Sequence, residues 1–428
     1  MATTVSQASA QQLPRLAADY LPNEREPVKR RIDSVDLLRG IVMVIMMLDH
    51  TRDFVHNAWV QFDALDPERT NVALFFTRWI THYCAPTFVF LAGTGAYFQF
   101  MRGKRKNELS HFLVTRGLWL VVLEFTAVRF FVTFNVQPSF FGMMQVIWAI
   151  GISMFCLAGL IYLPERVLIT FGLLMVALHN LLDRFRVAFG PGAPPPGLGS
   201  KIWMILHQPG GFQLAGVRSP VVLVLYPLIP WIGVMALGYA FGALYQMDHA
   251  QRKRWLIRIG GSAIALFIII RAINIYGDPN RWSVQSRGFI YTVLSFLNTT
   301  KYPPSLLFLL MTLGPAILAL AFFESSSTML TGLRKFFVTF GRVPLFFYLL
   351  QWPTAHLISL LLHWIFGKPY HWLFQTPVDW FTNLPQGIGF NLGVVYLSWI
   401  VGVLLLYPLC SWFAGVKQRR RDWWLSYL

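Results

Sequence analysis

The chain has few cysteines and few charged residues for its length. Of its 428 residues, 3 are cysteine and 13% are charged, with 19 Asp and Glu and 36 Lys and Arg. The cysteines, Cys84, Cys156 and Cys410, lie in apolar segments without the spacing of metal ligands. Neither a disulfide framework nor a zinc site is therefore expected, and the three residues are interpreted as small buried side chains.

Two further features are missing. Residues 1–28 lack the apolar core of a signal peptide, so we expect a disordered tail over about residues 1–30, with the first membrane helix acting as the targeting signal. The chain also lacks an internal repeat of 20 to 50 residues and any inverted symmetry between its halves. The absence of such symmetry argues against the common transporter folds.

Apolar residues dominate the chain, and they predict a membrane protein. Hydrophobic residues make up 55% of the sequence, with 37 Phe and 16 Trp. A net charge of +17 is compatible with nucleic-acid binding, but the basic residues lie mainly in short connectors between apolar runs. Because no basic patch alternates with exposed stacking aromatics, nucleic acid is not an expected partner.

Ten apolar runs have about the length that a membrane-spanning helix requires. They cover roughly residues 37–55, 72–100, 117–135, 142–162, 167–182, 221–245, 256–276, 304–323, 336–362 and 386–413. Backbone in lipid must satisfy its own hydrogen bonds, so runs of this length predict helices rather than barrel strands. The expected fold is all-α, a polytopic helical bundle with about 10 transmembrane helices.

The connectors between these runs alternate in charge. Every second connector is basic, namely residues 102–106, 164–166, 252–254 and 334–335, and so is the C-terminal tail at 417–421. The positive-inside rule then predicts that both termini are cytoplasmic. The expected organisation is one transmembrane domain over 31–416 and a short basic, aromatic tail over 417–428.

The first predicted helix carries ionisable residues along one face. Arg39 and His50 are 11 residues apart, close to three full turns, and therefore project from the same face about 16 Å apart. Asp36 lies three residues before Arg39. Ionisable residues at membrane depth usually face a functional cavity, and Asp36 is expected to line a substrate path there.

The stretch LDHTRDFVHNAW follows directly and holds two histidines and two aspartates. Asp53 is three residues from both His50 and His56, while Asp49 and His56 are seven apart. One carboxylate can thus orient either imidazole, an arrangement suited to general-base catalysis. The alternative is that these are interfacial charges where the helix leaves the membrane. A zinc site is disfavoured, because a separation of six places the two histidines on opposite faces of a helix.

Other ionisable residues are candidates for a substrate path. Glu124 and Arg129 fall inside the third run, where either a structural pair or a path lining is expected. Arg78 and His82 are four apart at the end of the second run and either face the acceptor or anchor the helix at the interface. His356, in the ninth run, is also expected to line the cavity.

The run RIDSVDLLRGIVMVIMMLDH, residues 31–50, resembles the start of the heparan-alpha-glucosaminide N-acetyltransferase catalytic-domain family. The matching positions are Arg31, Ser34, Asp36, Arg39 and Gly40. A second stretch, APTFVFLAGTGAYF at 85–98, is similar to the next conserved stretch of that family. Residues 226–242 and 341–351 resemble later signatures of its bacterial branch, within the transmembrane acyltransferase superfamily.

The resemblance leaves open which histidine is catalytic. In lysosomal members an asparagine occupies the place of His50, and a His-x-x-Trp pattern follows that matches His56 and Trp59. The spacing of 11 between Arg39 and His50 instead resembles membrane O-acyltransferases that modify surface polysaccharides. His50 or His56 would deprotonate the acceptor or carry the acyl group, with Asp49 or Asp53 orienting it.

The resemblance implies a membrane acyltransferase, and its bacterial branch implies a bacterial inner (plasma) membrane. The donor would be acetyl-CoA or another acyl-CoA on the cytoplasmic side, and the acceptor a sugar amine or hydroxyl on the outer side. The residues expected near the phosphates of CoA are Arg39, Arg102, Lys104, Arg105 and Lys106. No metal is expected, membrane lipid is an expected partner, and a homodimer is compatible with this interpretation. The alternative function is a proton-coupled secondary transporter that uses the same histidines and acids.

Overall fold

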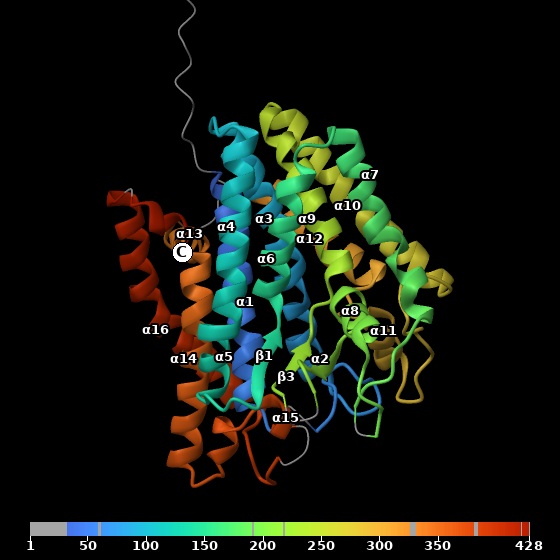
Figure 1. Ribbon diagram of the computed structural model, residues 1–428, viewed down its shortest axis with the longest axis vertical. Helices are drawn as coiled ribbons and strands as arrows, with labels where there is room; N and C mark the ends of the chain where they lie inside the picture. The colour runs from blue at the N-terminus through green and yellow to red at the C-terminus, as the bar shows by residue number, and fades with distance from the viewer. Residues whose placement is uncertain are drawn as a thin grey trace, which may run out of the picture. The chain divides into compact units, whose positions relative to one another are not determined.

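The computed structural model describes residues 32–58, 61–190, 192–216, 219–325, 331–380, 384–420 and 422–427. The expected tail of residues 1–30 lies outside these ranges, as do Arg31 and Trp59 of the sequence motifs. The described part of the chain is mostly helical, with one small sheet (Figure 1).

Helix α1 (Asp33–Val55) lies at the centre of the helical packing (Figure 1). Its neighbours are α3 (Cys84–Met101), α12 (Leu306–Ser325), α13 (Thr331–Arg342), α14 (Pro344–Ile365) and α16 (Leu392–Arg419). Two glycines bring α1 and α13 into backbone contact. A Cβ atom at Gly40 would lie 1.8 Å from the Phe337 carbonyl oxygen, and one at Gly341 would lie 1.8 Å from the Asp36 carbonyl oxygen. Only glycine permits this crossing.

A second group of helices packs around α9 (Leu228–Phe241). Its members are α3, α6 (Val146–Leu160) and α7 (Glu165–Leu178), while α4 (Lys106–Leu123) packs on α6 and α10 (His249–Ile273) packs on α12. Helix α4 continues through a π-helical turn at Glu124–Val128 into α5 (Arg129–Thr133). A π turn shifts the helix register, and such turns are frequent at functional sites.

Seven helices of the described residues are long and apolar enough to cross a membrane. They are Lys106–Thr133, Glu165–Arg184, Leu228–Gln246, His249–Ile273, Leu306–Glu324, Pro344–Ile365 and Leu392–Arg419. The expected helical membrane architecture is therefore confirmed, whereas the count of about 10 spans and the cytoplasmic termini stay predictions. Helix α1 is too rich in charge to be counted with these seven, and α6 has only 15 residues.

Two of the predicted runs are divided into separate helices, and two others, 142–162 and 221–245, begin in a strand. The run at 336–362 is broken between α13 and α14 at Val343, because the residue before Pro344 is disfavoured in the helical conformation. The run at 72–100 consists of α2 (Val72–Trp79), a 3-10 turn at Ile80–Tyr83 and then α3.

The expectation of an all-α fold is wrong in one respect, since three short strands form a sheet in the order β1-β3-β2. Strand β1 (Phe140–Met144) pairs in parallel with β3 (Val221–Val224), which pairs antiparallel with β2 (Gly210–Gln213). Residues 221–224, VVLV, were part of a predicted helix, but their β-branched side chains suit a strand. Residues of β1 and β3 line the same cavity as the C-terminal half of α1.

Short helices complete the described chain. They are α8 (Leu198–Leu206), α11 (Phe289–Leu297), α15 (Pro377–Trp380) and 3-10 turns at His179–Arg184, Gly242–Gln246, His371–Phe374 and Trp423–Ser426. Helix α16 runs three residues into the predicted tail at 417–428. The three cysteines are free, with Cys84 and Cys410 buried and Cys156 half-buried.

Candidate active site

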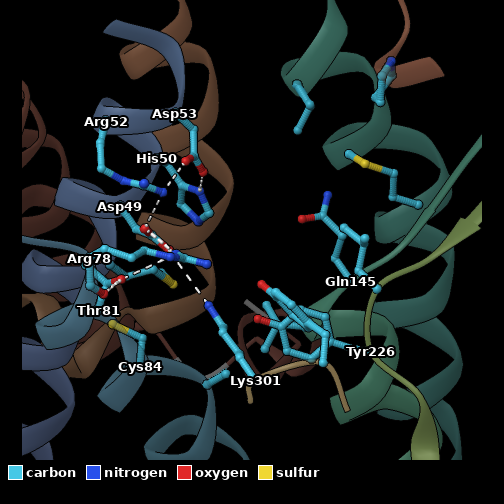
Figure 2. A pocket seen from close by; sticks show the side chains of 18 of the residues that line it. Asp49, His50, Arg52, Asp53, Arg78, Thr81, Cys84, Gln145, Tyr226 and Lys301 are labelled. Carbon is cyan, nitrogen blue, oxygen red and sulfur yellow. Dashed lines mark hydrogen bonds and ion pairs between the residues drawn. The ribbon is translucent and has the colours of Figure 1, made fainter. Parts of the chain in front are cut away.

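A cavity of about 330 Å³ lies beside the C-terminal half of α1, and we call it the His50 cavity. Its walls come from the helices α1, α2, α3, α5, α6, α14 and α15, from the strands β1 and β3, and from the segments at 62–64 and 301–302. Its polar lining residues are Asp49, His50, Arg52, Asp53, Asp63, Arg78, Thr81, Gln145, Tyr226, Lys301 and Tyr302. Figure 2 shows the charged cluster on one wall, facing Gln145 and Tyr226 across the cavity.

Asp49 is the centre of the charged cluster. Nη1 of Arg78 lies 2.5 Å from both carboxylate oxygens of Asp49, and Nη2 of Arg52 lies 3.1 Å from Oδ1. The Lys301 ammonium is 3.8 Å from Oδ2. Asp49 is only 7% exposed. A buried charge is tolerated only when it is paired, and here one carboxylate serves three cations.

His50 lies beside this cluster and faces the cavity. Its Nδ1 is 3.8 Å from Oδ2 of Asp53, and its ring lies 3.7 Å from the ring of Trp352. The other Asp53 oxygen accepts a 2.5 Å hydrogen bond from Arg52. A movement of about 1 Å would convert the contact between Asp53 and His50 into a hydrogen bond. Catalytic hydrogen bonds are often long before substrate binds, so the pair has the geometry of an oriented base.

His56 lies elsewhere, although it is only six residues away in the sequence. Helix α1 ends at Val55, and the half-buried His56 follows it, outside the described lining of the cavity. Nδ1 of His56 accepts a hydrogen bond from the backbone N–H of Ala58, and the backbone here pairs with Phe390. Burial, aided by the positive charge of Arg52, lowers the pKa of His56 to about 4. The structure thus separates the two candidate histidines.

Of the other sequence-predicted path residues, Arg78 lines the cavity and His82 does not. His82 is fully buried and packs against Phe308 at 5.1 Å between ring centroids. Neither of its ring nitrogens has a hydrogen-bond partner among the described residues.

Glu124, Arg129 and His356 lie behind the cavity wall, outside its described lining. Glu124 is buried and accepts a 3.0 Å hydrogen bond from the N–H of Trp148, in the first turn of α6. The first N–H groups of a helix have no partner within it, so this carboxylate caps α6. Arg129 donates to the carbonyl oxygen of Phe140, at the start of β1.

His356 is fully buried and stacks between two phenylalanines. Its ring centroid lies 4.8 Å from that of Phe54 and 4.1 Å from that of Phe134. Its Nδ1 lies 3.3 Å from the Phe131 carbonyl oxygen. Since Phe54 lines the His50 cavity, His356 supports the wall from behind.

The residues predicted to bind the donor lie at the other end of α1. Arg39 donates to Asp36 at 3.2 Å and to the Gly341 carbonyl at 3.3 Å, so the two residues spaced three apart on α1 are in contact. The remaining four, Arg102, Lys104, Arg105 and Lys106, lie at the junction of α3 and α4, at the same end of the bundle as the start of α1 (Figure 1). Arg105 pairs with Glu108 at 2.8 Å.

A second cavity, of about 360 Å³, lies near Arg39, and we call it the α13–α16 cavity. Its charged lining residues are Asp33, Arg334, Lys335 and Arg342. Arg342 directly follows Gly341, the residue that Arg39 contacts. Hydroxyl and amide groups of Thr331, Thr339, Ser411 and Gln418 complete its polar lining. Three cations against one acid make this cavity suitable for an anion.

Sequence reasoning missed several lining residues of the His50 cavity, among them Gln145, Tyr226, Lys301, Tyr302 and Trp352. Trp352 adjoins the signature at 341–351, and Tyr226 begins the signature at 226–242, so both were within reach of the motif comparison. No local pattern marks Gln145 or Lys301. Burial opposes ionisation of Tyr302, but Lys301 and Arg78 outweigh it and lower the pKa of the Tyr302 hydroxyl.

Comparison with known proteins adds one match. The family model described as heparan-alpha-glucosaminide N-acetyltransferase, catalytic, matches residues 31–277, more than half of the chain. No curated protein matches. The matched region contains the cluster from Asp49 to Arg78 together with Gln145 and Tyr226, and it ends before Lys301 and Trp352. Among the described residues, no group of three or more His, Cys, Asp or Glu is arranged to hold a metal ion.

Proposed function

We propose that this chain, which belongs to the heparan-alpha-glucosaminide N-acetyltransferase catalytic-domain family, transfers the acyl group of an acyl-CoA to a carbohydrate. Family membership and seven apolar helices indicate an integral membrane acetyltransferase. The finer proposal is that acetyl-CoA is the donor, that a sugar amine or hydroxyl is the acceptor, and that the two bind on opposite sides of a bacterial inner membrane.

The observation that carries this proposal is the position of His50. It is the histidine among the described lining residues, it lies within 3.8 Å of the Asp53 carboxylate, and the cations Arg52, Arg78 and Lys301 line the same cavity. A carboxylate beside an imidazole can hold the ring in one orientation, and fixed cations stabilise negative charge that develops on a reacting carbonyl. Proton transfer and charge stabilisation are what acyl transfer from a thioester requires.

The proposed reaction is a direct transfer. His50 accepts the proton of the acceptor amine or hydroxyl as that nitrogen or oxygen attacks the thioester carbonyl carbon. The carbonyl electron pair moves onto oxygen, and the tetrahedral adduct then collapses, which breaks the C–S bond. The CoA thiolate takes the proton from His50, so the enzyme returns to its starting protonation state. Asp53 holds the imidazole in one orientation through these steps.

The donor end of the proposal rests on the α13–α16 cavity. The phosphates of acyl-CoA are multiply charged, and Arg334, Lys335 and Arg342 offer cations around one space beside Arg39. Arg102, Lys104, Arg105 and Lys106 add positive charge at the same end of the bundle (Figure 1). The acyl arm would run along α1, where Arg39 and His50 are separated by about 16 Å of helix.

The test uses the full chain in lipid nanodiscs. Purified protein is incubated with acetyl-CoA carrying a radiolabelled acetyl group, with glucosamine as an amine acceptor or N-acetylglucosamine as a hydroxyl acceptor. We expect release of CoA thiol and label on a sugar, both lost in His50→Ala and retained in His56→Ala. If the wild-type protein neither releases thiol nor labels a sugar, the proposed function is wrong. Label that remains on the protein would replace direct transfer by an acyl-enzyme route.

A further inference from the structure

Lys301 lies in the His50 cavity but outside the region that the family model matches. It belongs to the segment 298–305, between α11 and α12. Lys301 is 8% exposed, and its ammonium approaches Asp49 to 3.8 Å, beyond hydrogen-bonding distance. Figure 2 shows Lys301 extending toward Asp49 and Arg78 from below, in the space between the α1 wall and the wall formed by Gln145 and Tyr226.

Lys301 shares the Asp49 carboxylate with Arg52 and Arg78, and it also hydrogen-bonds the Tyr302 hydroxyl. Arg52 and Arg78 each lie within 2.5 Å of a carboxylate oxygen of Asp49 or Asp53. Two acids against Arg52, Arg78 and Lys301 leave the cluster with one surplus positive charge. A buried surplus cation is costly unless an anion or a partly negative oxygen meets it.

Gln145 supplies an unsatisfied donor in the same cavity. It is 8% exposed, and its Nε2 has no hydrogen-bond partner among the described residues. It projects from the wall opposite Asp49 (Figure 2). An amide N–H that is buried without an acceptor is unfavourable, so a polar atom of a ligand is expected to satisfy it.

The segment that carries Lys301 is held firmly at its base by Asp278. The Asp278 carboxylate accepts hydrogen bonds from the Thr300 N–H at 2.8 Å, the Thr300 hydroxyl at 2.9 Å and the Ser305 hydroxyl at 2.6 Å. These bonds flank Lys301 on both sides. They fix the backbone from which its side chain enters the cavity.

Arg271 of α10 holds the preceding turn. It is 1% exposed and donates to the carbonyl oxygens of Ser295 at 3.0 Å, Phe296 at 2.9 Å and Asn298 at 2.6 Å. The last carbonyls of a helix lack partners within it, and Arg271 satisfies them at the end of α11. Arg271 and Asp278 together commit a buried arginine and a carboxylate to the placement of one segment.

We propose that Lys301 and Gln145 bind the oxygen of the reacting acyl carbonyl, with Asp278 and Arg271 as positioning residues for Lys301. This inference rests on the proposed acyl transfer. As the acceptor attacks the carbonyl carbon, the π electron pair moves onto oxygen, and the Lys301 ammonium and Gln145 N–H donate to that oxyanion. When the C–S bond breaks, the pair returns to re-form the carbonyl, and neither residue gains or loses a proton.

The kinetic test compares Lys301→Met, Lys301→Arg, Gln145→Leu and Asp278→Asn with the wild-type protein in nanodiscs. Removal of one oxyanion donor typically lowers kcat by a factor of roughly 100, and we expect this for Lys301→Met with KM values within about threefold. Lys301→Arg should recover part of kcat. Asp278→Asn should lower kcat without changing KM. In a protein that already carries Lys301→Met, Asp278→Asn should cause no further decrease in kcat. Arg281→Met, which removes an exposed cation near the same segment, is the control.

A measurement of CoA-derivative binding tests the role of Lys301 even if the protein does not turn over acetyl-CoA. The dissociation constants of acetyl-CoA and of S-ethyl-CoA, which lacks the carbonyl oxygen, are compared in wild type and Lys301→Met. One hydrogen bond to the carbonyl oxygen should make acetyl-CoA bind roughly fivefold more tightly than S-ethyl-CoA, and Lys301→Met should abolish this preference. Thermal unfolding of each variant shows that it is folded.

Three results would overturn the inference. The first is a Lys301→Met variant with unchanged kcat and unchanged binding preference. The second is a change only in the KM for the sugar, which would assign Lys301 to a charge on the acceptor. The third is a failure of both CoA derivatives to bind, which would overturn the proposed function as well. If both derivatives bind and acetyl-CoA is not turned over, the proposed acyl transfer is wrong, while the binding preference still decides the role of Lys301.

Discussion

The His50 cavity and the α13–α16 cavity both gather cations, but they hold them differently. In the His50 cavity, Arg52 is 6% exposed, Lys301 is 8% exposed, and carboxylates lie against them. In the α13–α16 cavity, Lys335 is exposed and Arg342 is half-buried, with Asp33 as the acid among the described lining residues. Buried and bonded charges cannot reorient, which suits catalysis, whereas water-accessible charges can exchange a soluble anion.

The two cavities also differ in how they are assembled. The α13–α16 cavity is formed by two helices and the first residue of α1. The His50 cavity combines segments from Met46 to Trp380, most of the chain. The comparison therefore predicts that substitutions in the His50 cavity have strong, specific effects and that substitutions in the α13–α16 cavity have weak, additive effects.

The largest expected effect separates His50 from His56. Loss of a general base costs a factor of roughly 100 to 10,000, so kcat should fall within that range in His50→Ala and by less than about threefold in His56→Ala. Steady-state kinetics with acetyl-CoA measure both, and thermal unfolding checks that each variant is folded. Equal losses, or a loss confined to His56→Ala, would transfer the catalytic role away from the cavity.

The next effect concerns stability. Asp49→Asn leaves Arg52, Arg78 and Lys301 buried with one fewer acid, and breaking a buried ion pair in this way costs about 3 to 5 kcal/mol. Asp33→Asn, at an exposed residue of the other cavity, should change stability little. Denaturant titration in detergent micelles compares the two free energies of unfolding. Similar values would show that Asp49 and Asp33 contribute equally to stability, despite their different burial.

A smaller effect is expected on donor binding. Lys335→Gln and Arg342→Gln should each raise the KM for acetyl-CoA by about five- to tenfold with kcat retained, since one charge-assisted hydrogen bond is lost. The KM of the wild-type protein should rise with ionic strength, because accessible charges are screened. Arg166→Gln, an exposed arginine in α7, is the control. If Lys106→Gln raises KM more than these variants do, the α3–α4 junction holds the phosphates instead.

The smallest effect is the pH response of His56. Because burial and Arg52 lower its folded-state pKa to about 4 from 6.5, the unfolded chain binds a proton between these values that the folded chain does not. Stability should therefore fall as pH drops from about 6.5 toward 4, and His56→Asn should lose that part of the decline. Melting temperatures at pH 7.5 and pH 5 measure it. A decline of equal size in the variant would assign it to other groups.

Local features of the site were predictable. The pairing of Asp36 with Arg39 and the contact of Asp53 with His50 both follow from the three-residue spacing on a helix. The division at Val343 was also available in the sequence, because Pro344 disfavours a helical residue before it. The sheet was not, since its strands are pieces of four or five residues and β1 pairs in parallel with β3, a strand far along the chain.

The sequence by itself determined a helical membrane protein of this acetyltransferase family and a face of α1 that carries Arg39 and His50, because apolar length and helical periodicity are local properties. Tertiary structure decided which histidine meets the cavity and which cations surround Asp49. Arg78 is 29 residues from Asp49, and Lys301 is 252 residues away. Contacts across such separations depend on how helices pack, and no local pattern encodes that packing.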